Sequence, residues 1–253
     1  MQNARRIQLE PGFLLHQRDF RDSSRIVEFL TRDHGRICLF ARGVRRAGSP
    51  LAALLQPFAP LLLSWSGSGD GGTLSACEAA GPRSSLPAAV LMSGFYLNEL
   101  LLKLLGREDS HPDVFEVYAL ALAGLAAPGE EQRALRLFEK RLLESLGFGI
   151  DYTHLAASGE AICADAYYHV RAERGVTGRA DRPGGEGVFA GRELLSFAAE
   201  ELADAASLAA AKRLMRAALD APLDGREIRT RTVARAVRAA GRNDHDGSEE
   251  SSR

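Results

Sequence analysis

The 253-residue chain has few cysteines, one tryptophan and no long apolar run, and these absences exclude several classes of protein. Its three cysteines, Cys38, Cys77 and Cys163, are far apart and form no C-x-x-C pair. This spacing argues against a disulfide framework and predicts a reducing, cytoplasmic location. No run approaches the roughly 18 apolar residues that a membrane span needs, so we expect no membrane association. The basic N-terminal residues precede no apolar stretch, and we expect no signal peptide.

Motifs of common catalytic sites are also absent. The sequence contains no G-K-[ST] phosphate loop, no G-x-S-x-G nucleophile elbow and no H-E-x-x-H metal motif. The pattern Gly67-x-Gly69-x-x-Gly72 matches a dinucleotide fingerprint, but strand-like residues follow it where the fingerprint requires a helix. We interpret this segment as a glycine-rich hairpin turn, and we predict no catalytic residue and no cofactor.

The positions of the histidines and cysteines do not indicate a metal site either. His154, Cys163 and His169 are the nearest approach to a metal cluster in the sequence. Their spacing is not that of a zinc site, and a fourth ligand is missing. We therefore predict no metal.

The net charge of −1 hides two basic regions. Residues 1–50 contain ten arginines and five acidic residues, and residues 212–242 contain nine basic and three acidic residues. Arginine binds phosphate oxygens bidentately, so the first region is either a phosphate-binding surface or a solvated face with local ion pairs. In residues 226–238 the charges alternate with apolar residues, which is typical of an amphipathic packing helix.

The first third of the chain shows strand patterns separated by turn residues. Five segments alternate in this way or are rich in β-branched and aromatic residues: 12–18, 25–31, 36–42, 58–65 and 73–79. Five short strands favour a closed OB-fold barrel over a sandwich, which needs about seven. We therefore expect a DNA-binding OB-fold domain at residues 1–80, with Arg45 and Arg46 in a loop after the third strand.

From residue 81 onward the pattern becomes helical, which makes the fold class α+β. We expect an α-helical domain over residues 81–242, with an irregular insertion or short hairpin at about 151–190 and a disordered tail at 243–253. Ser110-x-x-Asp113 resembles a capping box at the start of the second helix. Apolar spacing predicts helices over 86–105, 110–125, 130–146, 191–202, 207–221 and 226–238.

The third predicted helix combines cations with an apolar face. Arg133, Arg136 and Lys140 share one stripe, and Arg141 borders the apolar face. Such a surface would accept a short acidic peptide that ends in an aromatic residue. The alternative is an exposed basic face, paired with the glutamates at positions 130, 131, 139 and 144 of the same helix.

Seven short segments, in the same order along the chain, resemble the RecO family of bacterial recombination mediators in DNA repair. They are GFLLH at 12–16, DHGR at 33–36, ARGVR at 41–45, LQPFAPL at 55–61, YLNEL at 96–100, RLFE at 136–139 and LGFG at 146–149. The resemblance implies an N-terminal OB-fold, a helical C-terminal domain and no covalent catalysis. It also implies binding of single- and double-stranded DNA, strand annealing, and an association with the nucleoid.

The resemblance further implies partners and site residues. Family members act with RecR on DNA coated by single-stranded-DNA-binding protein, so that RecA can load. The acidic, Phe-ended tail of single-stranded-DNA-binding protein would dock around Arg133, Arg136, Lys140 and Arg141. On this chain the implied DNA surface consists of Arg25, Arg36, Arg42, Arg45 and Arg46.

The chain departs from one pattern of this family. Many members carry a four-cysteine zinc site after the LGFG segment, whereas this chain has only Cys163 there, consistent with the prediction of no zinc. A protein-binding adaptor, whose barrel contacts another subunit in place of DNA, is the alternative function. An enzyme of nucleic-acid metabolism is disfavoured, because the sequence shows no catalytic constellation.

Overall fold

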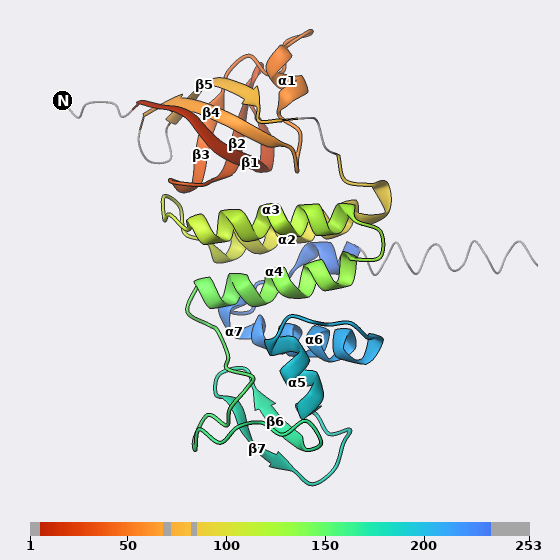
Figure 1. Ribbon diagram of the computed structural model, residues 1–253. Coiled ribbons are helices and arrows are strands. Elements are labelled where there is room, and N and C mark those ends of the chain that lie inside the picture. The colour runs from red at the N-terminus through yellow and green to blue at the C-terminus, as the bar shows by residue number, and fades with distance from the viewer. Residues whose placement is uncertain (1–5, 68–71, 82–84, 234–253) are drawn as a thin grey trace, which may run out of the picture.

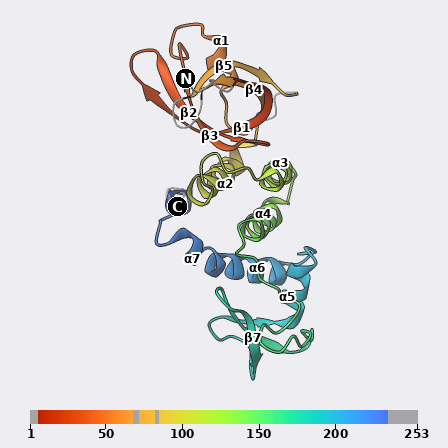
Figure 2. The same ribbon diagram turned by 90° about the vertical axis from the view of Figure 1, so that its left-hand side faces the viewer.

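The computed structural model describes residues 6–67, 72–81 and 85–233. A β-barrel lies at one end, a layer of helices lies in the middle, and a small sheet lies at the other end (Figure 1). The view turned by 90° shows the same succession (Figure 2). The expected tail at 243–253 and the later part of the last predicted helix lie outside the described residues.

The barrel is the five-stranded structure that the alternating pattern predicts. Its strands close in the order β1-β2-β3-β5-β4, with β3 and β5 parallel and the other pairs antiparallel. Ile37, Leu39 and Ala41 of one strand all point into the barrel core, because successive side chains of a strand face opposite sides. The bounds are β1 Arg6–Phe20, β2 Ser24–Thr31, β3 Gly35–Ala41, β4 Pro60–Ser66 and β5 Gly72–Ala79, with the short helix α1 Pro50–Leu54 between β3 and β4.

The glycine-rich segment is not followed by a helix. The antiparallel strands β4 and β5 flank it, and β5 begins at Gly72. The helix that a dinucleotide fingerprint requires is therefore missing, and the flanking strands agree with the hairpin interpretation. The turn residues 68–71 themselves lie outside the described part of the chain.

Helices follow the barrel, close to the predicted positions. Their bounds are η2 Ala88–Val90, α2 Leu91–Leu104, α3 Pro112–Ala126, α4 Glu131–Ser145, α5 Gly191–Ala198, α6 Ala205–Ala218 and α7 Asp220–Leu223. The capping box predicted for the second helix is wrong. The N-cap of α3 is His111, which makes no side-chain cap bond, and Pro112 occupies the first turn, where its missing N–H leaves no donor unsatisfied. Asp113 instead accepts a hydrogen bond from the hydroxyl of Ser145.

A three-stranded sheet occupies the stretch where the sequence pattern is weak. Strands β6 Tyr167–Arg171, β7 Gly175–Ala180 and β8 Val188–Ala190 pair in the order β7-β6-β8. Tyr168 anchors this sheet to the helices, because its ring is fully buried in the larger core. Its hydroxyl accepts a hydrogen bond from the backbone N–H of Cys163 at 2.8 Å.

The barrel is packed firmly against α2 and α3. The ring of Phe13 in β1 lies 5.2 Å from Phe115 and 5.1 Å from Tyr118. The buried amide of Asn98 donates to the carbonyl of Leu15 at 2.9 Å and accepts from the Tyr118 hydroxyl at 2.6 Å. These bonds satisfy both the nitrogen and the oxygen of the Asn98 side chain, so they fix the barrel on the helices.

Gly35 shows how close this approach is. Its φ is +64°, and a Cβ placed there would lie 1.9 Å from the carbonyl oxygen of Asp109. Both the backbone conformation and the contact therefore require glycine.

The last described residues return to the middle layer. Residues 229–233 are helical, and the carboxylate of Glu99 in α2 caps them by accepting from the backbone N–H groups of Arg229 and Thr230, each at 2.8 Å. These bonds lower the pKa of Glu99 against the opposing effect of its burial. Within the described ranges, no helix is long and apolar enough to cross a membrane.

Candidate functional site

The loop after β3 carries three exposed arginines, at positions 42, 45 and 46. Arg42 directly follows the last residue of β3, and Arg46 lies in a turn closed by its backbone N–H, which donates to the carbonyl of Gly43 at 3.2 Å. Neither guanidinium has a hydrogen-bond or ion-pair partner among the residues that the structure describes. Both cations are therefore available to an external anion.

Arg45 of this loop and Arg25 of the neighbouring strand β2 share one carboxylate, that of Asp19. The Nε of Arg25 lies 3.0 Å from Oδ1 of Asp19, and the Nε of Arg45 lies 3.4 Å from its Oδ2. Arg45 also donates to the carbonyl of Arg21 at 2.9 Å. These contacts tie the loop to the β1–β2 turn, and the cluster keeps one net positive charge.

Arg36 lies at the opposite end of β3, next to the helices. Its Nη1 donates to the carbonyl of Leu102 in α2 at 2.7 Å and lies 3.5 Å from Oε2 of Glu28. Its side chain is only 15% exposed. Arg42 lies six positions further along the chain, a span of about 20 Å in a strand. The structure thus gathers Arg25, Arg42, Arg45 and Arg46 at one end of the barrel, and the position of Arg36 favours a structural role.

Two further arginines near the loop were not among the predicted site residues. Arg18 in β1 and Arg21 in the β1–β2 turn are both exposed. Alternation alone could not have identified Arg18, because it lies four residues after the buried Leu14 and would share its face without the register shift after Leu14. Bulges of this kind are not visible in the residue pattern alone.

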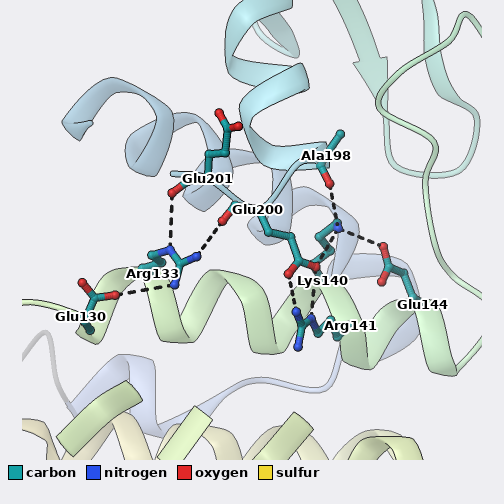
Figure 3. A network of polar contacts seen from close by, with 8 residues as sticks. All are labelled: Glu130, Arg133, Lys140, Arg141, Glu144, Ala198, Glu200 and Glu201. Atoms are coloured by element: carbon teal, nitrogen blue, oxygen red, sulfur yellow. Dashed lines mark hydrogen bonds and ion pairs between the residues drawn. The ribbon is translucent and has the colours of Figure 1, made fainter. Parts of the chain in front are cut away.

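The cations of α4 face an acidic turn that follows α5 (Figure 3). Nζ of Lys140 lies 3.0 Å from Oε1 of Glu200 and 3.4 Å from the carbonyl of Ala198. Arg141 binds both carboxylate oxygens of Glu200. Arg133 donates to the backbone carbonyls of Glu200 and Glu201 at 2.8 and 3.4 Å. Three of the four predicted peptide-binding cations thus bind this turn.

Glu200 is held as an anion by these partners. The hydrogen bond from Arg141 lowers the pKa of its carboxyl, with a smaller contribution from Lys140, against the effect of partial burial. In return, the same hydrogen bond raises the pKa of Arg141. No local pattern indicates this pairing, because Glu200 lies 60 residues after Lys140.

Arg136, the fourth predicted cation, is inside the protein. Its side chain is 7% exposed, and Nη1 lies 2.8 Å from Oε2 of the fully buried Glu139. The Tyr96 hydroxyl donates to the other Glu139 oxygen at 2.5 Å and accepts from Arg231 at 2.8 Å. Burial raises the pKa of Glu139, and the charge of Arg136 opposes that rise. This position favours a structural role for Arg136.

Arg141 also lines an open hollow on the protein surface. The hollow lies between α3 and α4 and has a volume of about 440 Å³. Its other lining residues are Asp113, Val117, Glu144 and Ser145. It therefore combines one apolar side chain with charges of both signs.

The residues present do not fit a four-cysteine zinc site. Within the described ranges, no three His, Cys, Asp or Glu side chains are grouped so that they could hold a metal ion. Cys163 is an exposed free thiol, and Nδ1 of His154 lies 3.1 Å from Asp151. The absence of zinc stays a prediction from the sequence.

Comparison with known proteins identifies the family. The model of the family described as "Recombination protein O N terminal" matches residues 6–83, and that of "Recombination protein O C terminal" matches residues 89–232. "DNA repair protein RecO" of Glaesserella parasuis serovar 5 is 40% identical over 227 residues, covering 87% of this chain and 94% of the relative. The protein of the same name from Nitrosococcus oceani is 41% identical over 237 residues, covering 93% and 96%. The chain therefore belongs to the RecO family of DNA repair proteins.

Proposed function

We propose that this protein is a non-catalytic recombination mediator that binds DNA and anneals complementary strands. It acts on DNA coated by single-stranded-DNA-binding protein, together with RecR, and so helps RecA to load. The observation that carries the proposal is the pair of exposed guanidiniums of Arg42 and Arg46 at the barrel edge, which have no partner among the described residues. We expect the protein in the cytoplasm, associated with the nucleoid.

Phosphate is the ligand that suits these two side chains. A guanidinium already paired with a carboxylate must break that pair before it binds DNA, whereas Arg42 and Arg46 need not. Contacts to phosphate also leave the base edges free, because they carry no direct sequence information. A strand held by its backbone can still pair with its complement, which annealing requires.

The helical layer is proposed to bind the acidic, Phe-ended tail of single-stranded-DNA-binding protein. Arg141 is the favoured contact, because it combines a charge at the surface with the hollow that Val117 lines. Arg141 would have to exchange its bonds to the Glu200 carboxylate, and Arg133 and Lys140 their bonds to residues 200 and 201. The tail would thus compete with Glu200 for the same cations.

The alternative is a protein-binding adaptor whose barrel contacts another subunit. Its surface would use the same arginines to pair with carboxylates. The two functions differ in their response to salt, because each phosphate that is neutralised releases condensed counterions from DNA.

Fluorescence anisotropy with labelled single-stranded DNA over a salt series tests the proposal. We expect log K to fall linearly with log salt for the wild type, and the slope to become shallower by about 1.4 in the Arg42→Ala/Arg46→Ala variant, at about 0.7 per phosphate contact. Arg171→Ala/Arg174→Ala is the matched control, since it removes the same charge from two exposed positions at the β6–β7 hairpin.

The outcomes separate the two functions. No binding at low salt, or a salt-independent affinity, would exclude phosphate contact and favour the adaptor. Equal slopes for the wild type and the Arg42→Ala/Arg46→Ala variant would move the DNA surface elsewhere on the protein.

A further inference from the structure

Two phenylalanines form a pair on the outside of the barrel. Phe20 ends β1, and Phe40 is the penultimate residue of β3, with β2 between these two strands. Their ring centroids lie 5.2 Å apart at an interplanar angle of 48°. Both rings are half-buried, and the rest of their surface faces solvent.

Neither ring belongs to a core of the protein. The residues that alternate with Phe40 in β3, Leu39 and Ala41, point into the barrel, so Phe40 points outward. Among the described residues, neither Phe20 nor Phe40 packs against the barrel core or the larger core. The pair therefore contributes little to holding the barrel together, beyond the contact of the two rings.

Strand pairing sets cations around the two rings. Ile26 of β2 pairs with Arg18 on one side and Phe40 on the other, so these three residues form one row across the sheet. Phe20 pairs with Ser24, whose small side chain leaves the space above β2 open. We call the outward surface made by Arg18, Phe20, Arg21, Phe40 and Arg42 the aromatic face.

One cation of the aromatic face lies directly over a ring, and two more lie at neighbouring positions of the strands. The guanidinium of Arg21 lies over the Phe20 ring, 5.1 Å from its centroid. Arg42 directly follows β3, two residues after Phe40, and its side chain is exposed. Of the nearby acids, Asp19 is paired with Arg25 and Arg45, and Asp22 is exposed in the turn.

An exposed aromatic pair with arginines at neighbouring positions is a surface that suits unpaired nucleobases. Bases stack on aromatic side chains regardless of sequence, while arginines follow the phosphates of the same strand. Bases in a duplex are already stacked on each other and offer only their edges. Such a surface would therefore distinguish single strands from duplexes.

We propose that Phe20 and Phe40 form a base-stacking platform for single-stranded nucleic acid. This inference rests on the proposed function, since it assumes that the barrel binds DNA, and it adds a second kind of contact. The arginines neutralise the backbone, and the two rings hold the bases. The β1–β2–β3 face, together with the loop after β3, then becomes the path of the strand.

An abasic oligonucleotide separates the two contacts. Anisotropy is measured for oligodeoxythymidylate and for an abasic chain of the same length, which has the same phosphates but no bases. We expect the wild type to bind the thymidylate at least about tenfold more tightly, as stacking on aromatic side chains predicts. Equal affinity for the two chains would overturn the platform while leaving phosphate binding, and thus the proposed function, intact. Failure to bind either chain at low salt would remove both.

A paired variant tests the residues themselves. Phe20→Leu/Phe40→Leu keeps apolar side chains at both positions, and we expect its preference for thymidylate over the abasic chain to fall to near unity. Its affinity for duplex DNA should not change. Phe148→Leu, at an exposed phenylalanine after α4, is the matched control and should keep the full preference.

Thermal unfolding by circular dichroism shows whether the paired variant is folded. If it is not folded, the single variant Phe40→Leu serves in its place. The comparison of thymidylate with the abasic chain in the wild-type protein needs no variant. A folded variant that retains the wild-type preference would place base contacts away from these rings.

Discussion

The loop after β3 and the stripe along α4 are both clusters of arginine and lysine, but only one is open to a ligand. Arg42 and Arg46 have no partner within the described residues, whereas Lys140 and Arg141 share the carboxylate of Glu200. The difference comes from residues distant in sequence. A cluster of cations therefore indicates a binding surface only after the anions that fold against it are known.

The largest expected effect concerns the buried member of the α4 cations. Arg136→Ala removes the partner of Glu139, which is fully buried. An uncompensated buried charge costs about 3–5 kcal/mol, so we expect the free energy of unfolding to fall by that order in urea denaturation. Arg171→Ala, at an exposed position, should change it by less than about 0.5 kcal/mol. A change that small for Arg136→Ala would contradict a structural role and return this residue to the peptide site.

A second comparison sets the two ends of β3 against each other. Arg36→Ala removes a charged hydrogen bond to the Leu102 carbonyl, so we expect a loss of about 1.5–3 kcal/mol in unfolding free energy. Its affinity for single-stranded DNA should stay at the wild-type value. Arg42→Ala should behave in the opposite way, with unchanged stability and weaker DNA binding. If Arg36→Ala weakened DNA binding at full stability, the DNA surface would extend along the whole strand.

Freeing Lys140 and Arg141 of α4 from Glu200 should have a smaller effect, on peptide affinity. Glu200→Gln removes the carboxylate that Lys140 and Arg141 share, so both cations become available to an acidic, Phe-ended peptide. We expect peptide affinity to rise about fivefold, as the removal of an ion pair worth roughly 1 kcal/mol predicts. Glu160→Gln, which breaks the exposed pair with Arg179 in the small sheet, is the control. Unchanged affinity in Glu200→Gln would separate the peptide site from these two cations.

The smallest effect is the pH dependence of the Glu200 pair. The folded-state pKa of Glu200 lies below its ordinary value of 4.5. Its contribution to stability is therefore present in full above that value and is lost as pH falls through the lower, folded-state pKa. We expect the difference in unfolding free energy between wild type and Glu200→Gln to be constant near neutral pH and to shrink below about pH 4.5. A difference that grew with acidification would reverse the sign of the shift.

Much of the fold is predictable from local pattern. Alternation at Ile37, Leu39 and Ala41 is enough to place β3 and its inward face, and the five strands close as expected. The spacing of Leu135, Phe138 and Leu142 places α4 and the side that it buries. Both signals arise within a few residues, where backbone geometry fixes which side chains share a face.

The candidate sites are less predictable, because they depend on contacts across the fold. Glu139 lies three residues from Arg136, yet nothing in that spacing indicates that both are buried or that Tyr96 of α2 donates to Glu139. Phe20 and Phe40 meet only because β2 lies between their strands, and their 5.2 Å contact is a property of the closed barrel. Charge counts alone would also group Arg36 with Arg42, although the Arg36 guanidinium is already hydrogen-bonded to the Leu102 carbonyl of α2.

The cap that Glu99 provides also bears on the order of events during synthesis. All strand pairs of the barrel join residues between 6 and 79, so the barrel can form as soon as that stretch has left the ribosome. Glu99 must wait for the backbone of Arg229 and Thr230, which emerge 130 and 131 residues later. Until then the Glu99 carboxylate of α2 lacks the two backbone N–H donors that it binds in the folded protein. The nascent chain therefore passes through a stage in which its barrel is complete while its helical layer is not.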